Sequence, residues 1–249
     1  MKYLCKIRFV GSGFCGFQTQ PGVRTVQGTL TAVASQLFGC PCLVTGCSRT
    51  DSGVHANMFC VTLEPTASVN IPPKALPKAL ATLLPEDLAC MEAVQVPEEF
   101  HPRYAAKGKE YLYLVDNGPV ADPFLRDRAY HVPYPLKEEA LAKMNVAADL
   151  LKGTHDFSSF MAAGSKITDA VRTVTHFSVR RNGDLLEFRV AADGFLYHMV
   201  RILVGTLLEV GRGVRPAESM PEILAAKDRK SAGATAPSAG LYLDRVFYE

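Results

Sequence analysis

The stretch Gly46-Cys47-Ser48-Arg49-Thr50-Asp51-Ser52-Gly53-Val54-His55-Ala56 lies between two short apolar runs, residues 42–45 and 58–63. Both runs are rich in Val, Leu, Phe, Thr and Cys, which is typical of β-strands. The segment between them is small, polar and interrupted by glycines, so it is a predicted loop. Arg49 and Asp51 stand in this loop with one threonine between them. A loop held between buried strands can present reactive side chains. The plain alternative is a turn closed by Asp51 beside a solvated Arg49.

Length and composition are those of a globular protein. The chain has 249 residues, 48% of them hydrophobic, which is enough to bury one large core or two modest ones and argues against disorder. The net charge of +2 gives little long-range attraction to nucleic acid. Any nucleic-acid binding must therefore come from a local basic patch.

The N-terminus and the cysteines indicate a soluble, cytoplasmic protein. Residues 3–10 alternate apolar and basic side chains as a strand does, and they lack the apolar core of a signal peptide. Residues 25–48 carry no charge, but glycines and a proline interrupt them, so no membrane span is predicted. Without an export signal the seven cysteines are expected to be reduced. Cys40, Cys42 and Cys47 lack a second ligand pair at zinc spacing, so no metal site is predicted.

Turn residues and hydrophobic periods divide the chain into two similar halves. In the first half, strands are predicted at 3–10, 42–45, 58–63 and 88–94, and helices at 26–38 and 72–84. In the second half, strands are predicted at 107–115, 171–180, 185–192 and 241–247, and helices at 136–152 and 195–210. Loops are predicted at 117–135 and from 154 on, with a flexible segment at 161–167 and a hairpin turn at Asn182-Gly183. This order predicts an α+β protein with two related halves, residues 1–103 and 104–249, each an antiparallel sheet with helices on one side.

The segment Gly11-Ser-Gly13-Phe-Cys-Gly16 matches the G-x-G-x-x-G pattern of dinucleotide sites. That function needs a helix to begin inside the motif, so that its N-terminus can bind the pyrophosphate. Residues 18–22, Gln-Thr-Gln-Pro-Gly, break a helix, and the next predicted helix begins only after Thr25, its N-cap. The glycines are therefore expected to shape a mobile or backbone-close loop.

Arg201 lies inside the most apolar predicted helix. Arginine is almost never buried unless it is paired, because an uncompensated buried charge costs several kcal/mol. Arg201 therefore needs a carboxylate, and Asp51 is the candidate whose loop is held between strands. The alternatives are that Arg201 reaches the surface or pairs with Glu209 or Asp193.

The strand at 107–115 places Lys109, Tyr111 and Tyr113 on one face. Two tyrosines beside a lysine can stack on nucleic-acid bases. Ordinary packing between strands is the alternative.

The loop at residues 48–56 resembles the signature Gly-Arg-Thr-Asp-Ala-Gly-Val-His-Ala of the TruA-type tRNA pseudouridine synthase family. The resemblance extends along nearly the whole chain. Its further blocks are Phe14–Gln20, Thr25–Leu30, Phe100–Ala106, Tyr111–Tyr113, Gly194–Arg201, Gly205-Thr206, Gly211–Gly213 and Ala236–Leu241.

The resemblance implies an isomerase that converts uridine to pseudouridine in the tRNA anticodon stem-loop, at positions thirty-eight to forty of tRNA numbering. It implies no cofactor and no metal. It also implies two ferredoxin-like halves that form a continuous, mainly antiparallel sheet with helices packed on one side and a central cleft. The expected assembly is a homodimer that binds tRNA across both subunits.

The resemblance also assigns roles to residues. Asp51 is the expected nucleophile, Arg201 its salt-bridge partner, and Tyr111 the ring that stacks on the uracil and a candidate base for its C5 proton. A stacked uridine must leave its helix to be reached. Whether Asp51 attacks the ribose or the base stays open. Further substrate-binding residues are expected at Arg49, Arg103 and Lys109.

The chain departs from the family pattern at several positions. Ser52 stands where Ala is usual, His198 replaces a usual Asn, and Lys109 stands where Arg is common, which keeps the charge but loses the bidentate fork. Two rival classes remain. A glycosidase needs a second carboxylate across the scissile bond, and a non-catalytic RNA-binding module needs neither Asp51 nor a paired Arg201.

Overall fold

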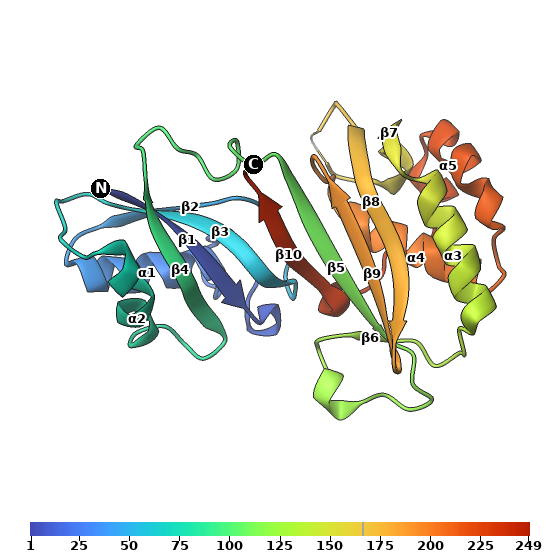
Figure 1. The fold of residues 1–249 in the computed structure, drawn as a ribbon, viewed down its shortest axis with the longest axis horizontal. Helices are drawn as coiled ribbons and strands as arrows, with labels where there is room; N and C mark the ends of the chain where they lie inside the picture. Colours follow the sequence, from blue (N-terminus) through green and yellow to red (C-terminus); the bar gives the residue numbers. More distant parts are fainter. Residues whose placement is uncertain (166) are drawn as a thin grey trace. The chain divides into compact units, whose positions relative to one another are not determined.

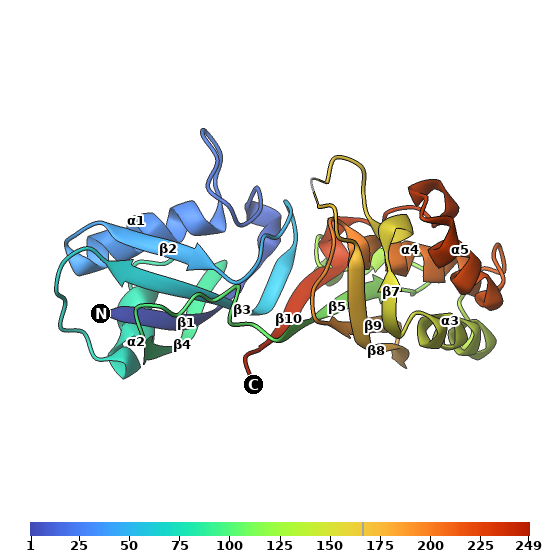
Figure 2. The same cartoon turned by 90° about the horizontal axis from the view of Figure 1, so that it is seen from above.

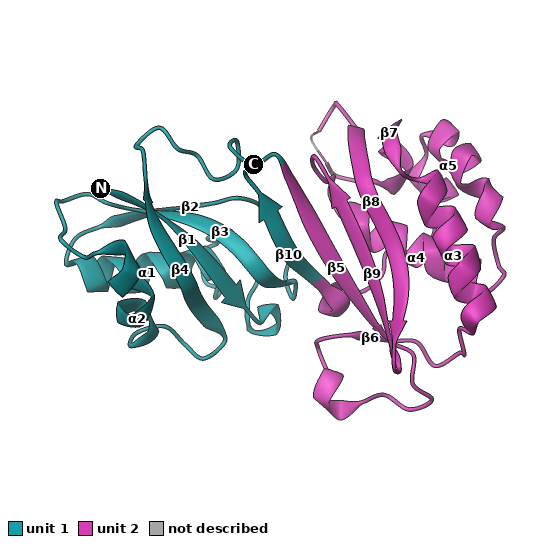
Figure 3. Cartoon of the chain, viewed as in Figure 1, with its two compact units in different colours: residues 1–107, 242–249 teal, residues 108–241 magenta. Residues whose placement is uncertain are grey.

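The computed structural model describes residues 1–165 and 167–249. These residues form two compact units, residues 1–107 with 242–249 and residues 108–241 (Figure 3). The last strand of the chain thus belongs to the first unit. The predicted division into 1–103 and 104–249 stays a prediction, because compactness does not test which segments fold independently. The segment predicted to be flexible, 161–167, includes Lys166, which lies outside the described residues.

The first unit has the strand and helix order of a ferredoxin-like fold. Its elements are β1 (Lys2–Phe9), α1 (Val26–Phe38), β2 (Cys42–Gly46), β3 (His55–Pro65), α2 (Leu76–Ala81) and β4 (Leu88–Val96). The sheet runs β4-β1-β3 with antiparallel pairing, and β2 is antiparallel to β3. The C-terminal strand β10 (Leu241–Phe247) joins β3 in parallel at Tyr242 and His55. Helix α1 packs on β2 and β3, α2 packs on β4, and the two helices touch, so they cover one face.

Helix α1 begins and ends where the sequence predicts. The Thr25 hydroxyl oxygen accepts the Gly28 N–H at 3.2 Å, and Gly39 closes the helix in the left-handed region at φ +66°. These caps satisfy backbone groups that a helix leaves unpaired at its ends. Val26 and Leu30 are fully buried, and each such side chain stabilises the unit by roughly 1.5–3 kcal/mol.

The second unit is built around an antiparallel sheet in the order β5-β9-β8-β7, with β6 parallel to β5. Its strands are β5 (Gly108–Asp116), β6 (Tyr130–His131), β7 (Gly153–Asp156), β8 (Val171–Asn182) and β9 (Leu185–Ala192). Its helices are α3 (Glu138–Leu150), α4 (Met199–Gly211) and α5 (Met220–Ala226). Helix α3 packs on β8 and α4, and α4 packs on β5 (Figure 1). Figure 2 shows the three helices together on one side of β8 and β9.

The predicted α+β class with mainly antiparallel strand pairing is confirmed. The central cleft stays a prediction. No helix in the described ranges is long and apolar enough to cross a membrane. The cytoplasmic location stays a prediction as well.

Three predicted helices are too long. The helix expected at 136–152 is α3, Glu138–Leu150. The helix expected at 72–84 is only α2, six residues, preceded by a 3₁₀ turn at Pro73–Ala75. Pro77 occupies the first turn of α2, and a proline cannot continue a helix from the preceding residues because it lacks an N–H and its ring clashes with the carbonyl four residues back. The helix expected from 195 begins at Met199, because His198 adopts a left-handed φ of +58°.

Other boundaries also differ from the prediction. Residues 153–156 were expected to leave a helix and enter a loop, but they form the edge strand β7. The irregular segment 117–135 contains a 3₁₀ turn at Pro123–Leu125 and the short strand β6. The hairpin turn is Gly183-Asp184, since Asn182 pairs with Leu185, one residue later than the Asn-Gly pattern predicts.

Candidate functional site

The loop that carries Asp51, residues 47–54, connects β2 to β3 in the first unit. The strand β2 pairs with residues 61–65 of β3, whereas β10 pairs with His55 and Ala56, the first residues of β3 after the loop. Its first residue is fixed by a bond from the Cys47 N–H to the Cys60 carbonyl at 2.8 Å. Its end turns back through a bond from the Val54 N–H to the Asp51 carbonyl at 3.2 Å. Asp51 is half-buried and Arg49 is exposed.

A second segment, residues 11–17, grips this loop and is named the clasp here. The Phe17 N–H donates to the Thr50 carbonyl at 3.1 Å, and the Gly53 N–H donates to the Phe14 carbonyl at 3.3 Å. The Ser52 hydroxyl also donates to the Phe14 carbonyl at 3.4 Å. Asp51 therefore lies between two residues whose main-chain groups are bonded to the clasp.

The glycines of the G-x-G-x-x-G pattern allow this approach. A Cβ on Gly11 would lie 1.9 Å from the Val54 carbonyl oxygen. A Cβ on Gly16 would lie 2.6 Å from the Thr50 carbonyl oxygen, and Gly16 has a φ of +83° that favours glycine. Of the two alternatives left by the sequence, the backbone-close loop is confirmed. Only a 3₁₀ turn, Gly11–Gly13, lies inside the motif, so the helix that a pyrophosphate site requires does not begin there.

His55 joins the loop to two other segments, a role that the sequence analysis missed. Its side chain is 1% exposed, and its Nδ1 accepts the Gly11 N–H at 2.9 Å. Its ring stacks on Tyr242 of β10 with centroids 4.6 Å apart. The acceptor role requires an unprotonated Nδ1. The position of His55 between Val54 and Ala56, both apolar, was a signal that its side chain is buried.

Arg103 belongs to the same unit and is exposed in the segment after β4. Its guanidinium carbon lies 6.0 Å from the centroid of the exposed Tyr104 ring. The His101 ring lies against Tyr104 at 4.3 Å between centroids, and its Nδ1 accepts the Arg103 N–H at 3.2 Å. The segment thus presents a cation beside an exposed aromatic ring.

In the second unit the two tyrosines that the sequence places on one face of β5 are both buried. Tyr111 is 7% exposed, and its ring forms a T-shaped pair with Phe195 at 4.9 Å between centroids. Tyr113 is fully buried, donates its hydroxyl to the Pro237 carbonyl at 2.7 Å, and has its pKa raised by burial. Tyr113 is therefore part of the core. Phe195 was expected inside the buried helix but lies in the segment before α4, against Tyr111.

Arg201 is half-buried on α4. Its Nε donates to the Ala236 carbonyl at 2.7 Å, and its own carbonyl accepts the Ala236 N–H at 3.1 Å. Two alternatives named from the sequence have other partners. Glu209 binds Arg215 at 3.0 Å, and Asp193 accepts the Thr173 N–H at 3.0 Å.

The structure thus brings Arg49 and Asp51 together on one clasped loop, with Arg103 elsewhere in that unit. Lys109 and Tyr111 lie two residues apart on β5 of the other unit. Over residues 1–165 and 167–249, no group of three or more His, Cys, Asp or Glu side chains is arranged to hold a metal ion.

Comparison with known proteins identifies the class of enzyme. The family described as tRNA pseudouridine synthase matches residues 6–105 and 147–249. The tRNA pseudouridine synthase A of Halalkalibacterium halodurans is 47% identical over 241 residues, which cover 96% of this chain and 90% of that protein. The tRNA pseudouridine synthases A of Geobacillus sp. and Moorella thermoacetica are 44% and 45% identical, and each alignment covers 97% of the relative.

The chain belongs to the tRNA pseudouridine synthase family. The resemblance inferred from residues 48–56 and the other blocks is thereby confirmed. Membership of an enzyme family also argues against the non-catalytic RNA-binding module and the glycosidase.

Proposed function

We propose that this protein isomerises uridine to pseudouridine at positions thirty-eight to forty of the tRNA anticodon stem-loop, with Asp51 as the nucleophile. Membership of the family makes the chain an isomerase that acts on tRNA. The observation that carries the role of Asp51 is its place on a loop gripped on both sides by the main chain of the clasp. Such a loop holds a reactive group in place before the substrate arrives.

The reaction needs a group that can form and release a covalent bond. The bond from uracil N1 to ribose C1′ breaks, the base turns, and a bond from C5 to C1′ forms. The C5 proton leaves and N1 gains a proton, so that the product is an isomer of the substrate. The Asp51 carboxylate forms the intermediate by attack on C1′ or on the base. The target uridine leaves its stack to reach the carboxylate.

In this proposal Arg201 pairs with Asp51 and keeps it ionised and oriented. Two facts support this role. Nε of Arg201 is bonded to the Ala236 carbonyl, which fixes the plane of the guanidinium. The other two carboxylates that the sequence offers as partners of Arg201 bind other groups: Glu209 binds Arg215, and Asp193 accepts the Thr173 N–H.

Tyr111 is proposed to stack on the uracil and to take its C5 proton. Phe195 packs against the Tyr111 ring in a T-shaped pair, a favoured arrangement of two aromatic rings. Arg49 and Arg103, both exposed, and the half-buried Lys109 are proposed substrate-binding residues. Arginine forks suit bidentate contacts to phosphate, whereas Lys109 acts as a point charge.

The protein is further proposed to act as a homodimer without cofactor or metal. Sedimentation at micromolar concentration tests the dimer. A monomer that modifies tRNA at the full rate would refute it.

The function is tested by tritium release from tRNA labelled at uridine C5. The wild-type protein is expected to release tritium, and Asp51→Asn none, because an amide is a far weaker nucleophile than a carboxylate. Glu86→Gln, which changes an exposed acid of the same unit, is the control and is expected to keep full activity. Transcripts with cytidine at one of the three positions map the sites. Release by Asp51→Asn would remove Asp51 from the mechanism, and no release by the wild type would refute the proposed function.

A further inference from the structure

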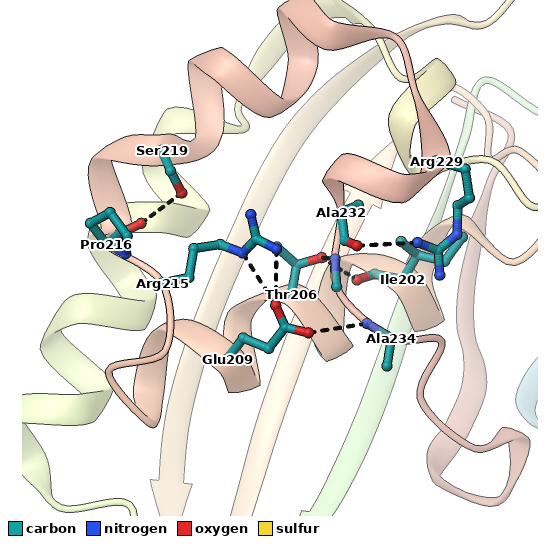
Figure 4. A network of polar contacts seen from close by, with 10 residues as sticks. Ile202, Thr206, Glu209, Arg215, Pro216, Ser219, Arg229, Ala232 and Ala234 are labelled. Atoms are coloured by element: carbon teal, nitrogen blue, oxygen red, sulfur yellow. Dashed lines mark hydrogen bonds and ion pairs between the residues drawn. The ribbon is translucent and has the colours of Figure 1, made fainter.

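The segment 232–237, named the strap here, lies along α4, and three of its N–H groups donate hydrogen bonds to that helix. Figure 4 shows the bonds that end on Thr206 and Glu209. The Gly233 N–H donates to the Thr206 hydroxyl at 2.9 Å. The Ala234 N–H donates to Glu209 Oε1 at 3.2 Å. The Ala236 N–H donates to the Arg201 carbonyl at 3.1 Å. Because these bonds fall on successive parts of the strap, they fix its register along the helix.

The residues of α4 that receive the strap share one face. Arg201, Gly205 and Glu209 are four residues apart, which places them in a row along a helix. Gly205 lies in the middle of this row, where a Cβ would be 1.8 Å from the Ala234 carbonyl oxygen. The strap therefore rests directly on the helix backbone at Gly205, and only glycine permits this approach.

Glu209 is itself held in one geometry. Its Oε2 accepts from Nε and Nη2 of Arg215 at 3.2 and 3.0 Å, while Oε1 is left to accept the Ala234 N–H. Figure 4 shows the carboxylate of Glu209 between Arg215 and the strap. Both partners of this pair are about one quarter exposed, so the pair is only partly screened by solvent.

The orientation of Arg201 depends on the strap. Nε of Arg201 donates to the Ala236 carbonyl at 2.7 Å, and Ala236 is two residues beyond the N–H that Glu209 binds. A shift of the strap along α4 would move this acceptor and turn the guanidinium with it. Small displacements matter here, because misplacing a catalytic group by about 1 Å can cost a hundredfold in rate.

We propose that Glu209 is a positioning residue for uridine isomerisation: by linking Arg215 to the Ala234 N–H it sets the register of the strap and thereby aims the Arg201 guanidinium. This inference rests on the proposed function, in which Arg201 orients Asp51. Glu209 itself does not touch the substrate.

The test compares kcat and KM for tRNA in the tritium-release assay, with thermal unfolding to verify folding. Glu209→Ala is expected to lower kcat by roughly tenfold or more and to leave KM unchanged. Glu209→Gln keeps an oxygen for the Ala234 N–H, so it is expected to restore kcat to within a few-fold of wild type. Glu218→Ala, an exposed acid of the same unit, is the control and is expected to match the wild type.

Gly205→Ala provides an independent route to the same displacement, since it pushes the strap away while Glu209 stays in place. It is expected to lower kcat as Glu209→Ala does, and the double variant is expected to lose no more than the larger single loss. If Glu209→Ala does not fold, Glu209→Gln and Gly205→Ala decide the matter.

Each outcome has one meaning. Wild-type kcat in folded Glu209→Ala or Gly205→Ala overturns the positioning role, as does a rise in KM at constant kcat. Failure of Glu209→Gln to recover activity also overturns it. A wild-type protein that releases no tritium refutes the proposed function instead, and it is therefore measured first.

Discussion

The clasp in the first unit and the strap in the second perform similar tasks with different groups. Each is a segment remote in sequence that holds one charged residue of the proposed site. The clasp binds the Asp51 loop through main-chain groups, Phe17 to Thr50 and Gly53 to Phe14. The strap is bound mainly by side chains, among them those of Arg201, Thr206 and Glu209 on α4.

The difference follows from the structure that receives each segment. A loop leaves its N–H and C=O groups unpaired, so a neighbouring segment can bond to them directly. Inside a helix the N–H groups are already bonded to carbonyls four residues back. A segment that lies on a helix must therefore be held by side chains. The Arg201 carbonyl is an exception because a carbonyl oxygen has a second lone pair.

It follows that the two regions should respond to different mutations. The clasp has few side-chain bonds to lose, so it is disrupted by adding atoms. The strap is disrupted by removing the polar atoms that bind it. Three measurements test this contrast, and a fourth tests an ion pair of the second unit that lies outside the strap.

The largest effect is expected for Gly11→Ala. The added Cβ would lie 1.9 Å from the Val54 carbonyl oxygen, so the backbone of both segments must move. We expect the free energy of unfolding to fall by about 3 kcal/mol. We also expect the variant to lose tritium release. Gly13→Ala is the control, because there the Cβ meets only the side-chain ends of Asp87 and Arg24. Urea unfolding measures both. Equal stability of the two variants would show that the clasp tolerates a side chain.

A smaller loss is expected when the strap loses one bond. Thr206→Val keeps the shape of a fully buried side chain but leaves the buried Gly233 N–H without its acceptor, which costs about 2 kcal/mol. Thr206→Ser keeps the hydroxyl and loses only a methyl group, about 1 kcal/mol. If the valine variant is as stable as the serine variant by urea unfolding, the hydroxyl does not hold the strap.

The charges of the second unit predict an acid sensitivity. Lys227, whose Nζ lies 2.8 Å from Asp156 Oδ2, and the Ser158 hydroxyl hold the pKa of Asp156 at about 2. Since an unfolded Asp has a pKa of about 3.9, this pair stabilises the fold above about pH 4 and its contribution is lost as the pH falls towards 2.

Asp156→Asn is therefore expected to lower stability at pH 7 by about 1 kcal/mol, a modest value because Lys227 is 62% exposed, and to flatten the decline between pH 4 and pH 2. Thermal unfolding against pH measures the slope. An unchanged slope would mean that the pair contributes nothing.

The smallest effect is expected at Ser52. Its hydroxyl bond to the Phe14 carbonyl is long, 3.4 Å, and the residue is exposed. Because the main-chain bonds of the clasp remain, Ser52→Ala is expected to change stability by less than about 0.5 kcal/mol and to leave tritium release unchanged. A larger loss in either assay would show that the Ser52 hydroxyl helps to hold the Asp51 loop against the clasp.

Local patterns were enough to predict the features whose causes are local. Thr25 and Gly39 fixed both ends of α1, because caps act on the adjacent turn. Strand β10 was predicted at 241–247 and lies there, bounded by turn residues. The Asp51 loop and the family also came from contiguous residues. The roles of Asp51, Tyr111 and Arg201 stay predictions that the tritium assay tests.

Which distant segments meet could be seen only in the folded chain. Residues 153–156 carry no strand pattern, and they became β7 because β8 offered an unpaired edge. The glycines at 11 and 16 indicated close approach, but only the fold showed that the Asp51 loop is what they approach. Nothing in the sequence around Thr206 and Glu209 indicated that their side chains bind the N–H groups of the strap. Local patterns in a sequence reflect the conformation of a few neighbouring residues. These contacts join positions far apart in the chain, so hydrophobic periodicity and turn signals cannot predict them.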